Sequence, residues 1–299
     1  MEHSKFSFLS GCAGFVDFVF AAEMFDALAG QDQENSIFFV LDGSDWSKYA
    51  FRAPWTAISM VTFKPSGGDR MVVAVSSSGD YWELNPRSLQ ELTGSIKQAV
   101  FPLRKLAIVS KDIYACAMGR SVLRRKSVGD WEEIGPGTKA DDDGLVVGFE
   151  DVDGFSGDEI YAVGWRGEIW EFVGGMWSLL DSPVSANLNA VCCADDDTVY
   201  IVGDDGCMLR GRGDIWEALS TERHENLMDV AYFDGSVYVT TDFHILKLQD
   251  DALIPEDAFA DPNDRPATCL HLLRSADGLV SMGAKDLFRL VAGTWERVV

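Results

Sequence analysis

The side chains that most often carry catalysis or bind metals are few in this chain and widely spaced. Its histidines are His3, His224, His244 and His271, and no HExxH pair or His/Cys cluster has the spacing of zinc ligands. No GxSxG sequence offers a nucleophilic serine. The glycine pairs fall between short alternating segments and not before a helix, which argues against a phosphate-binding loop. The sequence therefore predicts neither a cofactor nor a metal site.

Two aspartate triplets and the cysteines also lack a recognisable ligand pattern. The triplets Asp141-Asp142-Asp143 and Asp195-Asp196-Asp197 could supply oxygen ligands to calcium, but neither has the alternating spacing and closing glutamate of an EF-hand loop. The six cysteines include no CxxC pair and do not resemble a disulfide framework. Vicinal Cys192 and Cys193 would point to opposite faces of a strand and pack there. Free thiols in the cytoplasm are the simpler prediction.

Membrane attachment has one weak signal. Leu9-Ser10-Gly11-Cys12 matches a lipoprotein cleavage box with Cys12 as the lipidated residue, but the preceding residues are net neutral and include only a short apolar stretch. No run of 18 apolar residues occurs anywhere in the chain. We therefore expect no association with a membrane.

The charge balance indicates what kind of partner the protein can have. The chain holds 25 Lys and Arg against 48 Asp and Glu, a net charge of −23. Such a surface repels nucleic acid and attracts basic molecules, although solubility alone would also explain it. Basic residues are concentrated in 97–126 and acidic residues in 141–159. This separation fits either a solvated rim or a patch that orients a charged partner.

Internal repeats determine the predicted fold. DEIYAVGWRGEIWEFVGGMWSLL, from Asp158, and DTVYIVGDDGCMLRGRGDIWEAL, from Asp197, share two alternating strands, two glycine turns and a tryptophan. Weaker copies begin at Arg70, Asp112, Ser236 and Gly278, and an N-terminal copy fits least well. Each copy has the half-buried alternation of β-strands, and one such sheet can bury both faces only by stacking against others.

The spacing of the copies predicts seven blades of four strands. The residues that open the last strand of each copy are 37 to 46 positions apart, which is the length of a propeller blade. These residues are Trp46, Leu89, Trp131, Trp177, Trp216, Leu253 and Trp295. We therefore expect an all-β, seven-bladed β-propeller of antiparallel blades in one domain, 1–299. Its expected blades are 1–52, 53–94, 95–137, 138–181, 182–221, 222–256 and 257–299.

The recurring tryptophans are expected to pack between blades, because a large ring at the same place in each repeat suits a shared contact. Only AAEMFDALAG, from Ala21, has helical periodicity, and it predicts one short helix in the first blade.

At the level of these repeats the chain resembles bacterial propellers with VYAVG-x-x-G-x-I-x-R-x-x-G-x-W units. This group includes the photosystem II assembly factor type and relatives of Asp-box propellers. The resemblance extends from Arg70 to Val299 and implies architecture only, because such folds serve as hydrolases, lyases, assembly factors and binding platforms. The turns LDGSDW, SVGDW and GRGDIW match an Asp box only in part, and the arginine triad of a sialidase cannot be assigned.

One face of the predicted ring is expected to bind the partner. Connections between blades share a face with the turns between second and third strands, and long connections follow Gly135 and Pro255. Trp165 beside Arg166 is the strongest candidate, because tryptophan and arginine are enriched at interface hot spots. The other predicted partner-binding residues are Arg120, Asp141, Asp142, Asp143, Asp204, Asp205, Glu222, Glu225, His244, Lys285 and Asp286.

These observations favour a non-catalytic, cytoplasmic protein-binding propeller that is monomeric when free. Its acidic and divergent character looks like that of immunity proteins, which occlude the active site of a cognate toxin. A basic partner would then be attracted by charge. An assembly or scaffold factor that binds a client protein is the alternative. A hydrolase or lyase with carboxylates such as Asp204 and Asp205 in the central funnel is a second one.

Overall fold

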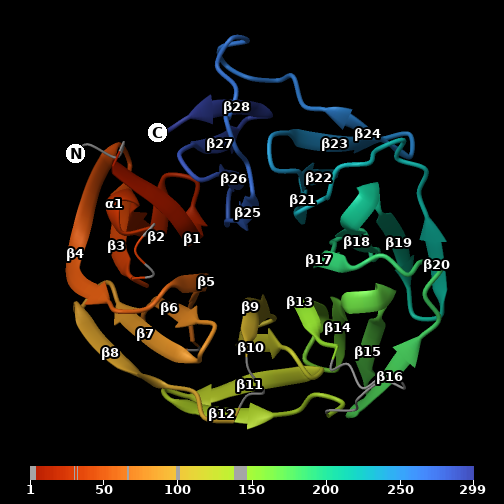
Figure 1. Ribbon diagram of the computed structural model, residues 1–299, viewed down its shortest axis with the longest axis horizontal. Helices are drawn as coiled ribbons and strands as arrows, with labels where there is room; N and C mark the ends of the chain where they lie inside the picture. Colours follow the sequence, from red (N-terminus) through yellow and green to blue (C-terminus); the bar gives the residue numbers. More distant parts are fainter. Residues whose placement is uncertain (1–4, 30, 32, 66, 99–101, 138–146) are drawn as a thin grey trace.

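The computed structural model describes residues 5–29, 31, 33–65, 67–98, 102–137 and 147–299. Within them the chain forms seven antiparallel sheets of four strands, arranged as a ring (Figure 1). We call these sheets blades 1 to 7 in chain order. The strands of blades 1 to 3 are β1 (Phe6–Phe15), β2 (Phe18–Phe25), β3 (Ser36–Asp42) and β4 (Asp45–Ala53); β5 (Ala57–Phe63), β6 (Met71–Ser76), β7 (Asp80–Asn85) and β8 (Gln90–Ser95); and β9 (Leu103–Val109), β10 (Asp112–Ala117), β11 (Ser121–Ser127) and β12 (Asp130–Glu133).

Blades 4 to 7 repeat this order. Their strands are β13 (Phe149–Ser156), β14 (Glu159–Gly164), β15 (Ile169–Val173) and β16 (Met176–Leu180); β17 (Leu188–Cys193), β18 (Val199–Gly203), β19 (Met208–Arg212) and β20 (Ile215–Ala218); β21 (Asp229–Phe233), β22 (Ser236–Thr240), β23 (Ile245–Gln249) and β24 (Ala252–Pro255); and β25 (His271–Arg274), β26 (Leu279–Met282), β27 (Leu287–Val291) and β28 (Thr294–Arg297). The all-β, seven-bladed propeller predicted from the repeats is therefore confirmed.

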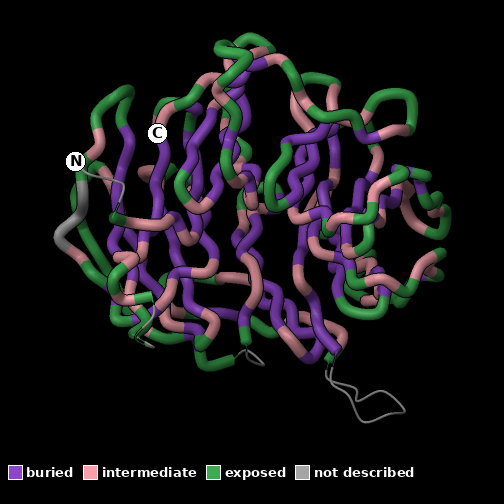
Figure 2. The backbone as a smooth tube through the Cα atoms, turned by 45° about the horizontal axis from the view of Figure 1, so that its top comes forward, coloured by how far each residue is buried: buried purple, intermediate pink, exposed green. Residues whose placement is uncertain are grey.

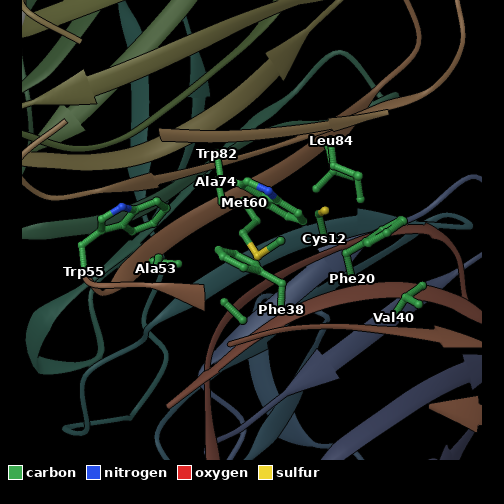
Figure 3. Packing of buried hydrophobic residues seen from close by; sticks show 13 residues of the cluster. Cys12, Phe20, Phe38, Val40, Ala53, Trp55, Met60, Ala74, Trp82 and Leu84 are labelled. Carbon is green, nitrogen blue, oxygen red and sulfur yellow. The ribbon is translucent and has the colours of Figure 1, made fainter. Parts of the chain in front are cut away.

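Buried side chains form seven clusters within the described residues, each between two neighbouring blades. Burial runs along the strands, and exposed residues gather at the turns (Figure 2). Between blades 1 and 2, Phe38 stacks on Trp82 with 4.1 Å between ring centroids, and Cys12 and Phe20 lie in the same cluster (Figure 3). The core is thus distributed among the interfaces around the ring.

The predicted role of the tryptophans is confirmed in four blades. Trp131 and Trp295 are buried against the preceding blade, and Trp177 and Trp216 pack there with part of their surface open. Trp177 also donates its indole N–H to the carbonyl of Ile134 in blade 3, at 2.6 Å. Each of these rings joins its own blade to the one before it.

The glycine that ends the second strand allows the inner strand to approach closely. A Cβ at Gly164 would lie 2.0 Å from the carbonyl oxygen of Gly148, and one at Gly203 would lie 2.1 Å from that of Asn187. Both distances are shorter than any real contact, so only glycine fits. This requirement explains the VG pairs that end YAVG and YIVG in the repeats.

The predicted helix from Ala21 is wrong for its first half. Ala21 and Ala22 belong to β2 and are fully buried, and the helix α1 is limited to Asp26–Ala29. Ladder pairing with β1 and β3 on both sides overrides the helical propensity of the alanines.

Each blade uses four consecutive strands, so the first and last blades share no strand. They are joined instead by a buried cluster that includes Val19 and Met282, and by the amide of Phe8, which donates to the carbonyl of Ala284 at 2.9 Å. The N- and C-terminal blades thereby close the ring (Figure 1).

Candidate functional site

Two regions of the ring bring polar and exposed residues together. The first is the face that carries the turns between second and third strands and the connections between blades, which we call the upper face. The second is the central channel, which is lined by the inner strands β1, β5, β9, β13, β17, β21 and β25 (Figure 1).

The upper-face turns of blades 4 and 5 have the same construction. These turns are η2 (Trp165–Gly167) and η3 (Asp204–Gly206), and their middle residues Arg166 and Asp205 adopt left-handed backbone angles with φ of 61° and 55°. Asn187 accepts the amide of Arg166, and Asn226 accepts the amide of Asp205, each at 3.1 Å. The connection that follows each blade therefore fixes that blade's own turn.

Sequence reasoning missed these two asparagines. The signal that could have found them is an Asn-Leu pair before the inner strand, at Asn187-Leu188 and Asn226-Leu227. In both places the leucine is completely buried and the asparagine side chain lies at the surface.

Trp165 lies at the surface, with 36% of its area exposed. Its indole N–H donates to Glu150 at 2.6 Å, and the same carboxylate oxygen lies 3.4 Å from Nε of Arg104. The ring is thus held by a hydrogen bond while part of its surface remains open. Phe243, in the equivalent turn of blade 6, is 60% exposed.

Acidic side chains surround the turn of blade 5. Asp204 accepts from Asn187 at 3.1 Å and from Asn189 at 3.0 Å, while Asp205 is exposed. Glu222 is exposed, and Glu225 pairs with Arg223 at 3.0 Å. His244, in the turn of blade 6, is also exposed.

Three further predicted residues make contacts within the ring. Arg120 is 5% exposed and forms a two-pronged ion pair with Glu168 of blade 4. Asp286 is also 5% exposed and accepts from Arg297 and from two backbone amides. Lys285 reaches across the closure of the ring to Asp26. The predicted residues Asp141, Asp142 and Asp143 lie outside the described residues.

Most of the basic segment 97–126 is paired with carboxylates. Arg124 and Lys126 pair within blade 3. The other five described pairs connect blades: they are Arg104–Glu150, Lys105–Asp151, Lys105–Asp229, Arg120–Glu168 and Arg125–Glu83. The segment therefore holds blades together more than it forms a surface patch.

A β-bulge near the start of the inner strand changes the direction in which the following side chains point in blades 1 to 5. The extra residue is Leu9, Ile58, Arg104, Glu150 or Asn189. In three of these blades the next residue forms a hydrogen bond with the backbone of the following inner strand: Ser10 donates to the carbonyl of Ala57, Ser59 accepts the amide of Leu106, and Asp151 accepts the amide of Val191. In blade 3 the next residue is Lys105, which donates to the side chain of Asp151 on the following inner strand.

Ion pairs cross the central channel, which encloses a volume of about 460 Å³. Lys105 of blade 3 lies 2.8 Å from Asp151 of blade 4 and 3.3 Å from Asp229 of blade 6. Arg274 of blade 7 lies 2.9 Å from Asp153 of blade 4. Inner strands on different sides of the ring are thereby connected through charged side chains.

Burial shifts the protonation of the channel. It raises the pKa of Asp151 to about 6, against the opposing attraction of Lys105. Burial also lowers the pKa of His271, and this shift outweighs the attraction of Asp229. At neutral pH the imidazole of His271 in the channel is therefore uncharged.

The cysteines of this protein are unpaired and mostly buried. All six cysteines are free, and Cys12 is buried in β1 among apolar side chains. Burial raises the pKa of Cys192 and of Cys207 to about 11, so both remain protonated near neutral pH. Among the residues with described positions, no group of three or more His, Cys, Asp or Glu side chains could hold a metal ion.

The described part of the chain also contains no helix with the length and apolarity needed to span a bilayer.

Solved structures with the same architecture are known. The chain aligns with YCF48 bound to D1 peptide with a TM-score of 0.67 and 14% identity, over 95% of this chain and 92% of that one. It aligns with the WD40 repeats of RRP9 with a TM-score of 0.62 and 13% identity, over 93% of this chain and 88% of that one. At these identities the likeness is one of fold alone.

Sequence comparison identifies a nearer relative. No family model matches the sequence. The chain is 34% identical over 305 aligned positions to the immune protein Tsi7 of Pseudomonas aeruginosa, which covers 98% of this chain and 97% of the relative. The alignment spans nearly the whole of both chains. The chain therefore belongs to the family of the immune protein Tsi7.

Proposed function

We propose that this propeller is an immunity protein that neutralises a cognate toxin by binding it and occluding its active site. The observation that carries the proposal is the 34% identity to Tsi7 along 98% of the chain. A shared scaffold alone would not support it, because propellers have many functions. We also propose that the protein acts in the cytoplasm, as a free monomer and without catalysis of its own.

The upper face of blades 4 to 6 is the proposed toxin-binding surface. It combines two exposed aromatic rings, Trp165 and Phe243, with the carboxylates of Asp204, Asp205 and Glu222. Trp165 is held by its bond to Glu150, so little side-chain entropy remains to be lost on binding. Aromatic anchors of this kind commonly provide most of the affinity of an interface.

The partner that fits this surface is basic. The net charge of −23 attracts a positively charged protein over a distance of about 8 Å at physiological salt. Electrostatic attraction raises the association rate, while the desolvated aromatic contacts limit dissociation. Arg166 and His244 at the same face would meet acidic groups of the toxin.

The test combines purification of the partner with a protection assay. The tagged protein is purified from its native cells, and the co-purified protein is identified by mass spectrometry. That protein is then produced in a sensitive host with or without the propeller. The expected result is one stoichiometric partner that stops growth alone and is harmless in the presence of the propeller. A partner that is not toxic, or a toxin that remains lethal, would contradict the proposal.

A pair of matched variants tests the proposed face. Trp165→Ala should weaken toxin binding at least tenfold, which is about 1.4 kcal/mol. The control is Ile215→Ala, because Ile215 is 80% exposed but begins β20 at the opposite face. Equal affinities for the two variants would place the interface away from Trp165.

A further inference from the structure

The central channel presents positive groups although the whole protein is strongly acidic. The side chains of Arg104, Lys105 and Arg274 keep 33%, 34% and 45% of their surface open. The carboxylate partners that line the channel with them are almost closed off: Asp151, Asp153 and Asp229 expose 3%, 4% and 8%. The formal charges of these six groups cancel, but a molecule in the channel would meet mainly the cations.

The carboxylates are closed off because the channel wall already uses their oxygens. Asp151 accepts the amides of Val152 and Val191 at 2.8 and 3.0 Å. Asp229 accepts those of Val230 and Leu272 at 3.0 and 2.9 Å. Asp153 likewise accepts two amides, those of Gly154 and Cys193. Much of their acceptor capacity is therefore directed into the wall.

The three cations have N–H donors that form no hydrogen bond within the described part of the protein. A guanidinium group carries five N–H donors, yet Arg274 makes one bond to a carboxylate oxygen and one long contact to the sulfur of Cys192, at 3.8 Å. Arg104 lies 3.4 Å from Glu150, and its Nε makes no hydrogen bond; another nitrogen contacts only the sulfur of Met118, at 3.7 Å. Lys105 uses two of its three donors, on Asp151 and Asp229.

We propose that the central channel is a second binding site, which takes a small oxyanion, either a phosphate or a carboxylate. The oxygens of the anion would accept from the unused donors of Arg274, or of Arg104 and Lys105 nearer the upper face. The cations are already held in place by Asp153, Asp151 and Asp229, so the site needs little rearrangement to bind. Charge-assisted bonds to arginine are the strongest that such a ligand can form.

The site differs from the proposed toxin-binding surface in chemistry and position. The upper face offers carboxylates and aromatic rings, whereas the channel offers enclosed cations within about 460 Å³. That volume accommodates a small ligand and not a folded domain. Binding of the anion can therefore be measured without the toxin.

The experiment is isothermal titration calorimetry on the full chain in a phosphate-free buffer of low ionic strength. Sodium phosphate and sodium citrate are injected separately, with sodium chloride as the control for ionic strength. We expect saturable binding of at least one of the two oxyanions at one or two sites per chain. Saturation by phosphate alone would identify a phosphate site, and saturation by citrate alone would identify a carboxylate site. No saturable binding of either anion would overturn the proposal.

Substitutions of the channel arginines show where the anion binds. Arg274→Gln and Arg104→Gln each remove one cation of the channel, and at least one of them should weaken binding tenfold or more. The matched control is Arg289→Gln, which removes an arginine that pairs with Glu296 on an outer strand. Circular dichroism shows whether each variant is folded. If Arg274→Gln does not fold, Arg274→Lys keeps the charge and removes the fork of donors. Unchanged binding in Arg104→Gln and in the folded Arg274 variant would overturn the proposal.

Discussion

The buried ion pair between Arg125 and Glu83 should be among the strongest single contacts between blades 2 and 3. Arg125 Nε lies 3.1 Å from one oxygen of Glu83 and its Nη2 lies 2.7 Å from the other. The side chain of Glu83 is 1% exposed and that of Arg125 is 11% exposed. The guanidinium also lies over the ring of Phe63, at 5.3 Å from its centroid. Water therefore has little access to either charged group.

The perturbation is Arg125→Met, which keeps most of the apolar stem and removes the charge. It leaves the carboxylate of Glu83 enclosed without its cation, and breaking a buried pair in this way costs about 3 to 5 kcal/mol. By contrast, the double variant Glu83→Leu with Arg125→Met removes both charges together, and it should recover most of that loss because no enclosed charge remains. The two single variants should therefore be far from additive.

Urea unfolding, followed by tryptophan fluorescence and by circular dichroism, measures both changes. The control is Arg87→Met, because Arg87 is 83% exposed and its pair with Asp69 is at the surface; a loss below 1 kcal/mol is expected there. A loss below 1 kcal/mol in Arg125→Met would show that the pair does not stabilise the contact between blades 2 and 3. A double variant as unstable as the sum of the single variants would equally contradict a buried, coupled pair.

Three further predictions follow from the fold. Trp295→Ala should lower the free energy of unfolding by about 3 to 5 kcal/mol, because the ring is 0% exposed and packs on Tyr238 of blade 6; a loss below 1 kcal/mol in urea would contradict this packing. Gly203→Ala should lower the melting temperature, because the added Cβ would lie 2.1 Å from the carbonyl oxygen of Asn187. The control is Ser178→Ala on the outer strand β16, and equal melting temperatures for the two variants would refute the close approach to Asn187. Burial raises the pKa of Glu23 from its ordinary value of 4.5 to about 8, so the folded state binds this proton more tightly than the unfolded state. The protonated carboxyl of Glu23 therefore stabilises the fold at low pH, and this stabilisation is lost as the pH rises from about 5 to 8. Between about pH 5 and 8 the urea midpoint should fall less in Glu23→Gln than in the original protein. If the midpoints of the two proteins change with pH in parallel, Glu23 does not cause the pH dependence of stability.

Much of the fold could be predicted because it repeats. One blade contains too little information to identify a propeller, but the same strand, turn and tryptophan pattern at 37 to 46 residues indicates stacked sheets. The first blade was the exception: Ala21 and Ala22 suit a helix locally, and only pairing on both sides makes them a strand.

The candidate site was predictable only in part. The turn sequences place Trp165 and Asp204 in equivalent positions, as they do Arg166 and Asp205, and these residues lie on the upper face. The same reasoning grouped Arg120 with them, although it is buried against Glu168. A turn position specifies where the backbone lies, whereas the exposure of its side chain depends on the neighbouring blade.

The sequence by itself determined the number of blades, the order of their strands and the packing role of the tryptophans, because these follow from local alternation repeated along the chain. Only the tertiary structure decided which charges meet in the channel. Lys105 and Asp229 are 124 positions apart, and Arg274 and Asp153 are 121 apart. Closure of the ring brings these pairs together across its axis, and no periodicity along the chain records such a contact.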